Sequence, residues 1–341
     1  MKTPVFILFG PTASGKTALL ERLFTPPEAR IQAEIISADS MQVYRGMDIG
    51  TAKPTPEEQA KIPHHLIDIR NPDEQFNAGE FVRLAEEACL AVSRRGALPV
   101  VSGGTGFYLK NLVLGLSEAP PSDEGIRLKL REELSLRGAV SLMEELAAAD
   151  PVSAGRIHVN DGYRLLRALE VYRVSGRPLS SYASPWNSAG PATDSSERPF
   201  RFLLAGLRRN REELYRRIND RTAAMFRAGL PAEVSRLYKA GYTPADPGLR
   251  AIGYREFFVQ DGNGSKGDNG SKGDTASEGS DGWRLSEDLA GVEALVAQNS
   301  RRYAKRQITF FASLSGVTWI DCGENNDTAR EILRLLEDFL Y

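Results

Sequence analysis

The chain has 341 residues, a hydrophobic fraction of 41% and a formal net charge of -2. Chains beyond about 250–300 residues tend to divide into domains, so we expect one large domain with a smaller partner or insertion. The near-neutral charge excludes a uniformly basic polyanion-binding protein. The two cysteines, Cys89 and Cys322, lie far apart without a CxxC pattern, which excludes a thiolate zinc site and argues against a disulfide scaffold.

The apolar start of the chain is a strand rather than a targeting signal. Met1–Gly10 is short, leads directly into a glycine loop and has no cleavage-site pattern. No apolar run reaches the about 20 residues that a membrane-spanning helix needs. We therefore expect a soluble cytoplasmic protein, and a monomer.

The first hundred residues alternate short apolar runs with helical patterns. The patterns predict strands and helices at 5–9 (strand), 17–24 (helix), 33–37 (strand), 78–95 (helix) and 98–102 (strand). Pro26 and Pro27 end the first helix, and Gly96 closes the second. Strand–loop–helix units in this order are typical of a doubly wound parallel sheet, so the predicted fold class is α/β.

The middle of the chain changes character. Successive helical patterns without a clear strand occur at 124–137, 139–149, 151–157 and 162–174. We interpret this stretch as a helical insertion at 118–198, which separates two parts of the core at 1–117 and 199–341. Strand character returns at 202–206, and long helices follow. Residues 263–274 repeat one hexamer, Asn-Gly-Ser-Lys-Gly-Asp, so 261–282 is predicted to be a flexible linker.

Two segments concentrate positive charge. Residues 208–221 contain six arginines against three acids. No acid lies between Glu293 and Asp321, where four basic residues occur: Arg301, Arg302, Lys305 and Arg306. Local basic patches, more than net charge, indicate phosphate contacts. On charge alone a solvated helix face explains these segments equally well, because Lys and Arg are mostly exposed in any protein.

Residues 10–17, Gly-Pro-Thr-Ala-Ser-Gly-Lys-Thr, fit the P-loop pattern GxxxxGK[ST] between a predicted strand and a predicted helix. Glycines let several backbone N–H groups point at one anion, and the helix N-terminus adds its dipole. We expect Lys16 to reach the terminal phosphate and the Thr17 hydroxyl to hold Mg²⁺. The predicted diphosphate- or nucleotide-binding residues are Gly10, Pro11, Thr12, Ala13, Ser14, Gly15, Lys16 and Thr17.

A P-loop alone does not imply ATP hydrolysis, because NTPases also need a Walker B carboxylate at the end of a strand. The predicted strand at 98–102 leads into Gly103 and Gly104 instead. The strand that ends near Ser37 is followed by Asp39, whose carboxylate is placed to act as a general base on a substrate nucleophile. Taken alone, an acid at this position is more often a turn or N-cap residue.

Eight segments in order along nearly the whole chain resemble the bacterial tRNA dimethylallyltransferase family, also called tRNA isopentenyltransferases. They are GPTASGKT (10–17), ADSMQVYRGMDIGTAKP (38–54), HHLID (64–68), GGTGFYLKNL (103–112), YRLLRALEVYRVSGRP (163–178), RINDRTAAMFRAGLPAEV (217–234), AIGYREF (251–257) and RRYAKRQ (301–307). The second segment is highly specific, whereas a P-loop by itself is not. The resemblance implies a P-loop nucleotide-kinase-like core with a mostly helical insertion.

The resemblance also implies a reaction. A dimethylallyl group moves from dimethylallyl diphosphate to N6 of adenosine 37, beside the anticodon of tRNAs that read codons beginning with U. The implied catalytic residues are Asp39 as the base, Thr105 near both substrates and Arg221 at the leaving diphosphate, with Mg²⁺ as cofactor. The implied contacts with the tRNA anticodon stem-loop are Asp39, Ser40, Met41, Gln42, Thr105, Arg127, Tyr163, Arg164, Leu165, Leu166, Arg167, Arg250, Gly253, Tyr254, Arg255, Lys305, Arg306 and Gln307.

The sequence departs from the family pattern in two respects. Relatives often carry Gln where Tyr163 stands, and a tyrosine ring can stack on a base. The zinc finger of some eukaryotic relatives is ruled out by the spacing of the two cysteines and three histidines. The adjacent His64 and His65 point to opposite faces of a strand, which favours a structural role over a metal pair.

Three other functions remain open. An adenylate dimethylallyltransferase would act on free AMP, but the helical insertion and the basic 301–306 segment favour a large polyanion. A small-molecule kinase would use ATP, and the missing Walker B strand argues against it. A nucleotide-binding module without catalysis is disfavoured by the specific segment around Asp39.

Overall fold

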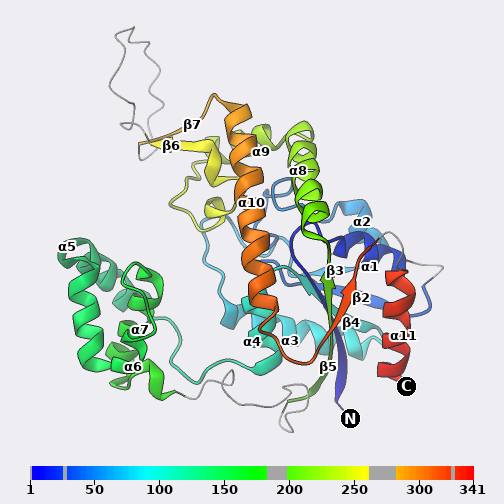
Figure 1. Cartoon of the computed structure of the whole chain (residues 1–341), viewed down its shortest axis with the longest axis horizontal. Helices are drawn as coiled ribbons and strands as arrows, with labels where there is room; N and C mark the ends of the chain where they lie inside the picture. The colour runs from blue at the N-terminus through cyan, green and yellow to red at the C-terminus, as the bar shows by residue number, and fades with distance from the viewer. Residues whose placement is uncertain (1, 26–28, 183–197, 261–281, 324–326) are drawn as a thin grey trace. The chain divides into compact units, whose positions relative to one another are not determined.

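The computed structural model describes residues 2–25, 29–182, 198–260, 282–323 and 327–341. The chain divides into two compact units, one formed by 1–113 with 191–341 and the other by 114–190 (Figure 1). The insertion predicted at 118–198 overlaps the second unit. The linker predicted at 261–282 lies outside the described residues except for Gly282.

The larger unit is built on a six-stranded sheet with the order β3-β2-β4-β1-β5-β8 (Figure 1). Every neighbouring pair is parallel, which confirms the predicted α/β class. The central strand β1 is buried on both faces, and this explains why 5–9 is a continuous apolar run. The strands are β1 (Thr3–Phe9), β2 (Ala33–Ser37), β3 (His64–His65), β4 (Leu98–Gly103), β5 (Phe200–Arg208) and β8 (Val317–Asp321).

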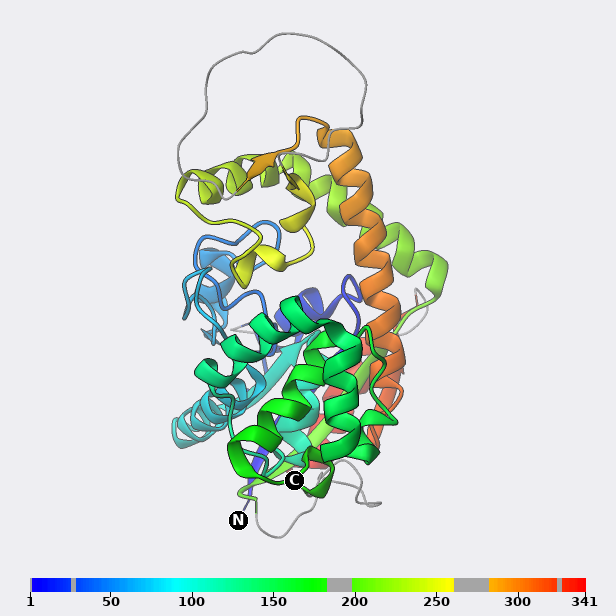
Figure 2. The same ribbon diagram turned by 90° about the vertical axis from the view of Figure 1, so that its left-hand side faces the viewer.

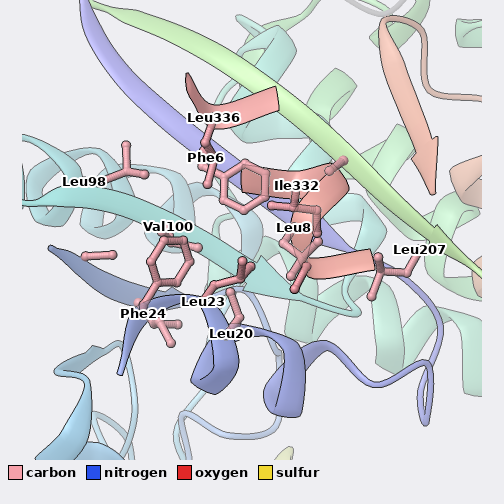
Figure 3. Packing of buried hydrophobic residues seen from close by; sticks show 14 of the residues in the cluster. Phe6, Leu8, Leu20, Leu23, Phe24, Leu98, Val100, Leu207, Ile332 and Leu336 are labelled. Carbon is pink, nitrogen blue, oxygen red and sulfur yellow. The ribbon is translucent and has the colours of Figure 1, made fainter. Parts of the chain in front are cut away.

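Side chains of β1 alternate between two apolar layers, as the period of two requires. Phe6 and Leu8 pack on one face against α1 (Lys16–Phe24) and α11 (Thr328–Leu340), as Figure 3 shows. Phe9 lies in the other layer, with ring centroids 4.8 Å from Phe311 of α10 (Leu289–Phe311) and 5.8 Å from Trp319 of β8. The sheet is thereby fixed between the helix that begins at the P-loop and the long helix α10.

The remaining helices of this part of the chain connect the strands. α2 begins with a capping box, in which Thr55 and Glu58 exchange side-chain and backbone hydrogen bonds. A separate antiparallel pair is formed by β6 (Phe258–Gln260) and β7 (Trp283–Leu285). None of the helices in the described part of the chain is both long and apolar enough to cross a membrane. The helices are α2 (Pro56–Lys61), α3 (Ala78–Arg94), α4 (Gly106–Leu114), α8 (Arg211–Arg227) and α9 (Leu230–Lys239).

A buried carboxylate holds the loop that follows β2. Glu233 of α9 accepts hydrogen bonds from the backbone N–H groups of residues 48–50 at 2.9–3.2 Å and from the Tyr254 hydroxyl at 2.7 Å. A buried charge is tolerated when donors satisfy it in this way. Val43 and Met47 pack in the same apolar cluster as α9. The loop that carries the 38–54 segment is thus held in place by Glu233 and by the apolar cluster around α9.

The smaller unit is helical, as predicted. It contains α5 (Glu124–Ala149), α6 (Pro151–Ala154) and α7 (Gly162–Ser175). α5 is interrupted at Gly138, which has φ 78° and ψ 163°, and this is the position between the two helices predicted at 124–137 and 139–149. The helix predicted at 151–157 ends early, at Ala154. The unit has its own apolar core of Leu130, Leu142, Leu146, Leu165, Leu166, Ala168 and Leu169.

Candidate active site

The P-loop connects the end of β1 to the start of α1. Gly15 has φ 101°, a left-handed conformation that glycine adopts without strain, and it is the N-cap residue of α1. No side chain caps α1, so the backbone N–H groups of its first turn are available to an anion. This is the local geometry that the sequence motif predicts.

Three arginines hold the P-loop in place. Arg217 Nε donates to the Ala13 carbonyl at 2.9 Å, and Arg209 Nε donates to the Ser14 carbonyl at 3.2 Å. Arg221 Nη1 donates to the Thr12 hydroxyl at 3.2 Å. The basic 208–221 segment therefore includes loop-fixing residues. Only Arg221 was predicted individually, because the charge pattern does not reveal which arginines reach the loop.

A cavity of about 510 Å³ opens beside the P-loop. This volume is typical of a small-molecule site. Its polar wall includes Lys16, Asp39 and Arg221, and its apolar wall includes Leu20 and Ile35. A cavity with both characters suits an apolar group attached to an anion. The predicted site residues that line it are Thr12, Ala13, Ser14, Gly15, Lys16, Thr17, Asp39, Gln42, Arg221 and Gln307.

The side chain of Lys16 folds back onto the P-loop. Its Nζ donates to the carbonyl groups of Gly10 at 2.8 Å and Pro11 at 3.1 Å. Burial, followed by the nearby charge of Arg221, lowers the pKa of Lys16 to about 8, and Asp39 acts in the opposite direction. The charge of this lysine is therefore sensitive to pH close to the physiological range.

Asp39 combines a turn contact with a place in the cavity wall. Its Oδ1 accepts the Met41 N–H at 2.9 Å. The carboxylate also lines the cavity, where its charge acts to raise the pKa of Lys16, Arg221 and Tyr303. The turn contact that the sequence pattern favoured is present, and it involves only the Oδ1 atom in the Met41 bond.

Thr105 and Tyr303 lie next to this carboxylate. The Thr105 hydroxyl accepts the Ser40 N–H at 3.0 Å and lies 3.3 Å from Ser40 Oγ. Burial, followed by the charge of Asp39, raises the pKa of Tyr303 to about 12, while hydrogen bonds with Thr105 and Gln307 oppose the change. Tyr303 is therefore a neutral phenol at physiological pH and cannot supply the general base.

Gln42 is fixed in one orientation. Its Oε1 accepts from the Ser37 hydroxyl at 2.9 Å, and its Nε2 donates to the Ala52 carbonyl at 3.1 Å. The Ala52 carbonyl belongs to the loop that Glu233 anchors. The Gln42 side chain is therefore held between the carboxyl end of β2 and that loop. Of the other tRNA contacts predicted in this segment, Ser40 and Met41 are half-buried directly after Asp39.

The remaining predicted tRNA contacts differ in exposure. In the helical unit, Tyr163 is 72% exposed, and the Arg127 guanidinium lies 5.1 Å from the centroid of its ring. Arg164 is exposed, whereas Leu165 and Leu166 are buried in the helical core and Arg167 pairs with Glu170 at 2.9 Å. In the larger unit, the exposed side chains are Arg250, Arg255, Lys305 and Arg306, and the buried residues are Gly253, Tyr254 and Gln307.

Within the described residues, no group of three or more His, Cys, Asp or Glu side chains could hold a metal ion. His64 and His65 have separate partners, because His64 Nδ1 lies 2.7 Å from the Ile62 carbonyl and His65 Nε2 lies 2.7 Å from Glu34. These separate partners are what a structural role for each histidine requires. Thr17 is exposed on the first turn of α1 and lines the cavity.

A family model described as IPP transferase matches residues 42–314. The chain belongs to this family. It is 40% identical to the tRNA dimethylallyltransferase of Geobacter sulfurreducens, over 97% of this chain and 96% of that protein. It is 41% identical to tRNA dimethylallyltransferase 1 of Syntrophotalea carbinolica, over 100% of this chain and 97% of that protein.

Two solved structures match this chain over nearly its full length. The full-length tRNA isopentenylpyrophosphate transferase of Bacillus halodurans matches with a TM-score of 0.63 and 33% identity, over 99% of this chain and 97% of that one. A eukaryotic dimethylallyltransferase acting on tRNA matches with a TM-score of 0.73 over 99% of this chain and 79% of that one. At 22% identity, that second likeness shows the fold alone.

Proposed function

We propose that this protein transfers the dimethylallyl group of dimethylallyl diphosphate to N6 of adenosine 37 in tRNAs that read codons beginning with U. The observation that carries the proposal is that the Asp39 carboxylate lines the same cavity as the P-loop. The names of the relatives in this family support the choice of both substrates. A P-loop suits an anionic leaving group, and a nearby carboxylate suits a weak amine nucleophile that must lose a proton.

The reaction is a substitution at an allylic carbon. N6 of the adenine forms a bond to C1 of the dimethylallyl group, and the bond from C1 to the diphosphate oxygen breaks. The electron pair leaves with the diphosphate, and the N6 proton passes to Asp39. An exocyclic amine is a poor nucleophile, so a positioned base assists as its proton leaves. The adenine must leave its stack to reach the cavity, and splayed loop bases are the usual targets of RNA recognition.

The leaving group is stabilised by positive groups that line the cavity. Lys16, Arg221 and the N–H groups at the start of α1 surround the place of the diphosphate. Hydrogen-bond donors that are already in position stabilise the negative charge that develops in the transition state. They lower the barrier effectively because they do not have to reorient during the reaction. Arg221 is well placed for this role, since its bond to Thr12 directs it to the loop.

We propose that Mg²⁺ accompanies the diphosphate. The donor set fits this ion, because Mg²⁺ keeps several water molecules and uses few protein ligands beside phosphate oxygens. The Thr17 hydroxyl lines the cavity at the start of α1 and would be its protein ligand. When bound, the ion would neutralise part of the charge on the diphosphate.

The basic face of α10 is proposed to bind the tRNA backbone. Arg302 and Lys305 are exposed on this helix. We expect Arg302→Ala combined with Lys305→Ala to weaken tRNA binding and to reduce the slope of log K against log salt by about 0.7–0.9 per lost phosphate contact. Filter binding between 50 and 200 mM salt measures this slope.

A matched control removes two positive charges elsewhere. Arg330 and Arg334 are exposed on α11, and Arg330→Ala with Arg334→Ala should leave both affinity and slope as in the wild type. A salt slope that the α10 double variant does not change would show that this face of the helix makes no phosphate contacts.

The lowered pKa of Lys16 predicts a pH-dependent affinity for the diphosphate. Below pH 8 the lysine is charged and attracts the anion, and above pH 8 the free protein loses this charge. The terminal phosphate is already doubly ionised there, since its pKa is about 6. We expect the dissociation constant of dimethylallyl S-thiolodiphosphate, measured by calorimetry, to be nearly constant to about pH 7.5 and then to rise toward about tenfold per pH unit.

Lys16→Met provides the comparison for this titration. It should bind the analogue more weakly at every pH and show no rise between pH 7.5 and 9.5, because its side chain has no proton to lose. If the wild-type protein and Lys16→Met gave parallel profiles, another group would be responsible for the pH dependence.

The proposed function is tested by incubating the protein with Mg²⁺, dimethylallyl diphosphate and unmodified tRNA, then digesting the tRNA and identifying its nucleosides by mass spectrometry. We expect N6-dimethylallyladenosine from tRNA with adenosine 37 and none from the same tRNA with guanosine 37. Prenylated AMP instead of prenylated tRNA, or transfer of labelled γ-phosphate from ATP, would establish one of the alternative enzymes.

A further inference from the structure

Gln307 occupies an unexpected position for a residue whose motif implies a tRNA contact. It lies on α10 between the exposed Arg306 and the exposed Ile308, but is itself only 6% exposed. Its Oε1 accepts the Thr12 N–H at 2.9 Å, and its Nε2 donates to the Gly104 carbonyl at 2.8 Å. Figure 2 shows α10, in orange, passing beside the dark-blue segment that contains the P-loop.

These two bonds join three distant parts of the sequence. Thr12 is 295 residues from Gln307, and Gly104 is 203 residues away. Thr12 belongs to the P-loop, while Gly104 follows β4 and precedes Thr105. One amide group therefore sets the spacing between the diphosphate loop and the turn that carries Thr105.

The bond to Thr12 has a consequence for the anion. A backbone N–H that donates to Gln307 is not free to donate to a diphosphate. The hydroxyl of the same residue accepts from Arg221. Because Gln307 fixes the Thr12 backbone, it also fixes the hydroxyl that receives the guanidinium.

Only a side chain with one acceptor and one donor at this reach satisfies both backbone partners, and Tyr303 is a third, side-chain partner of Gln307. Gln307→Glu keeps an acceptor for Thr12, but its carboxylate cannot donate to Gly104 and adds a negative charge near the diphosphate. Gln307→Met has a similar length and satisfies neither partner. Gly104 and the Gln307 side chain are in close contact, because a Cβ at position 104 would overlap the amide nitrogen of Gln307.

We propose that Gln307 is a positioning residue for the diphosphate and not a contact with tRNA. It acts through Thr12 and Arg221, holding the P-loop in the conformation that receives the leaving group. The inference rests on the proposed function for the identity of the ligand, and it changes the role that the RRYAKRQ motif implies for its last residue.

The test compares two equilibrium constants in the full-length protein. Binding of dimethylallyl S-thiolodiphosphate with Mg²⁺ is measured by calorimetry, and binding of unmodified tRNA is measured by filter retention. We expect Gln307→Met and Gln307→Glu each to weaken analogue binding by about tenfold or more, since a buried bonding group is left unpaired. Both variants should bind tRNA with a dissociation constant within about twofold of the wild-type value. This difference is smaller than the effect expected from the loss of one hydrogen bond.

Lys305→Ala, two residues earlier on the exposed face of α10, should show the reverse pattern, with weaker tRNA binding and unchanged analogue binding. Analogue binding like wild type in both Gln307 variants would overturn the inference. A loss of tRNA affinity as large as the loss of analogue affinity would also overturn it. Wild-type protein that binds no analogue would instead contradict the proposed function, so the two failures are distinct.

Discussion

Asp39→Asn is expected to lower kcat by about 10²–10⁴-fold, the usual contribution of a general base. The amide has nearly the shape of the carboxylate, and its Oδ1 can still accept the Met41 N–H, so the turn after β2 should survive. What is lost is the group that accepts the N6 proton. The affinities for tRNA and for the diphosphate analogue should therefore change little.

Single-turnover transfer from dimethylallyl diphosphate to tRNA measures this effect without interference from product release. Asp73→Asn serves as the control, because Asp73 is an exposed acid of the same charge outside the cavity wall. Its rate should match that of wild type. Wild-type turnover by Asp39→Asn would remove Asp39 as the base.

Arg221→Gln is expected to have the second largest effect. Removing one fixed donor from a developing negative charge typically costs about 10²–10³-fold in rate. Burial lowers the pKa of the Arg221 guanidinium while Asp39 opposes this change, and a buried charge beside the P-loop interacts strongly with a diphosphate. The loss should fall on kcat as well as on diphosphate binding, because the charge on the leaving group grows as the C1–O bond breaks.

Arg216→Gln is the matched control for this variant. Arg216 lines the same cavity, but its side chain is largely exposed and lies 3.6 Å from Asp220. Its substitution should change kcat by less than about fivefold, as for an exposed ion pair. If the two glutamine variants lost equal activity, general positive charge rather than a positioned guanidinium would account for the role of Arg221.

The parts of the fold that depend on local patterns could be predicted from the sequence. The strand at 33–37 has the predicted bounds, and those at 5–9 and 98–102 differ from the structure by one or two residues. Each of these strands contains a short apolar run, because both faces of the sheet are covered. β8 (Val317–Asp321) was not predicted, since it is an edge strand whose residues are mostly only half-buried and its apolar run is interrupted.

The local geometry of the P-loop could be predicted from the sequence, whereas the side chains that hold this loop in place could not. Gly15 and Lys16 form a contiguous motif whose geometry follows from local backbone preferences. Arg209 and Arg217 meet that loop only because β5 lies beside β1, and no local pattern reveals such a contact. Tyr254 illustrates the opposite problem, because it belongs to a motif that implies RNA contact but is buried against Glu233.

The central claim is that the P-loop holds the leaving group while Asp39 faces the incoming amine. A crystal structure with dimethylallyl S-thiolodiphosphate and a tRNA anticodon stem-loop tests it most directly. We predict diphosphate oxygens at Lys16 and the start of α1, with an Asp39 oxygen about 2.6–3.2 Å from N6 of adenosine 37. A diphosphate bound away from the P-loop, or an Asp39 carboxylate turned away from the adenine, would contradict the claim.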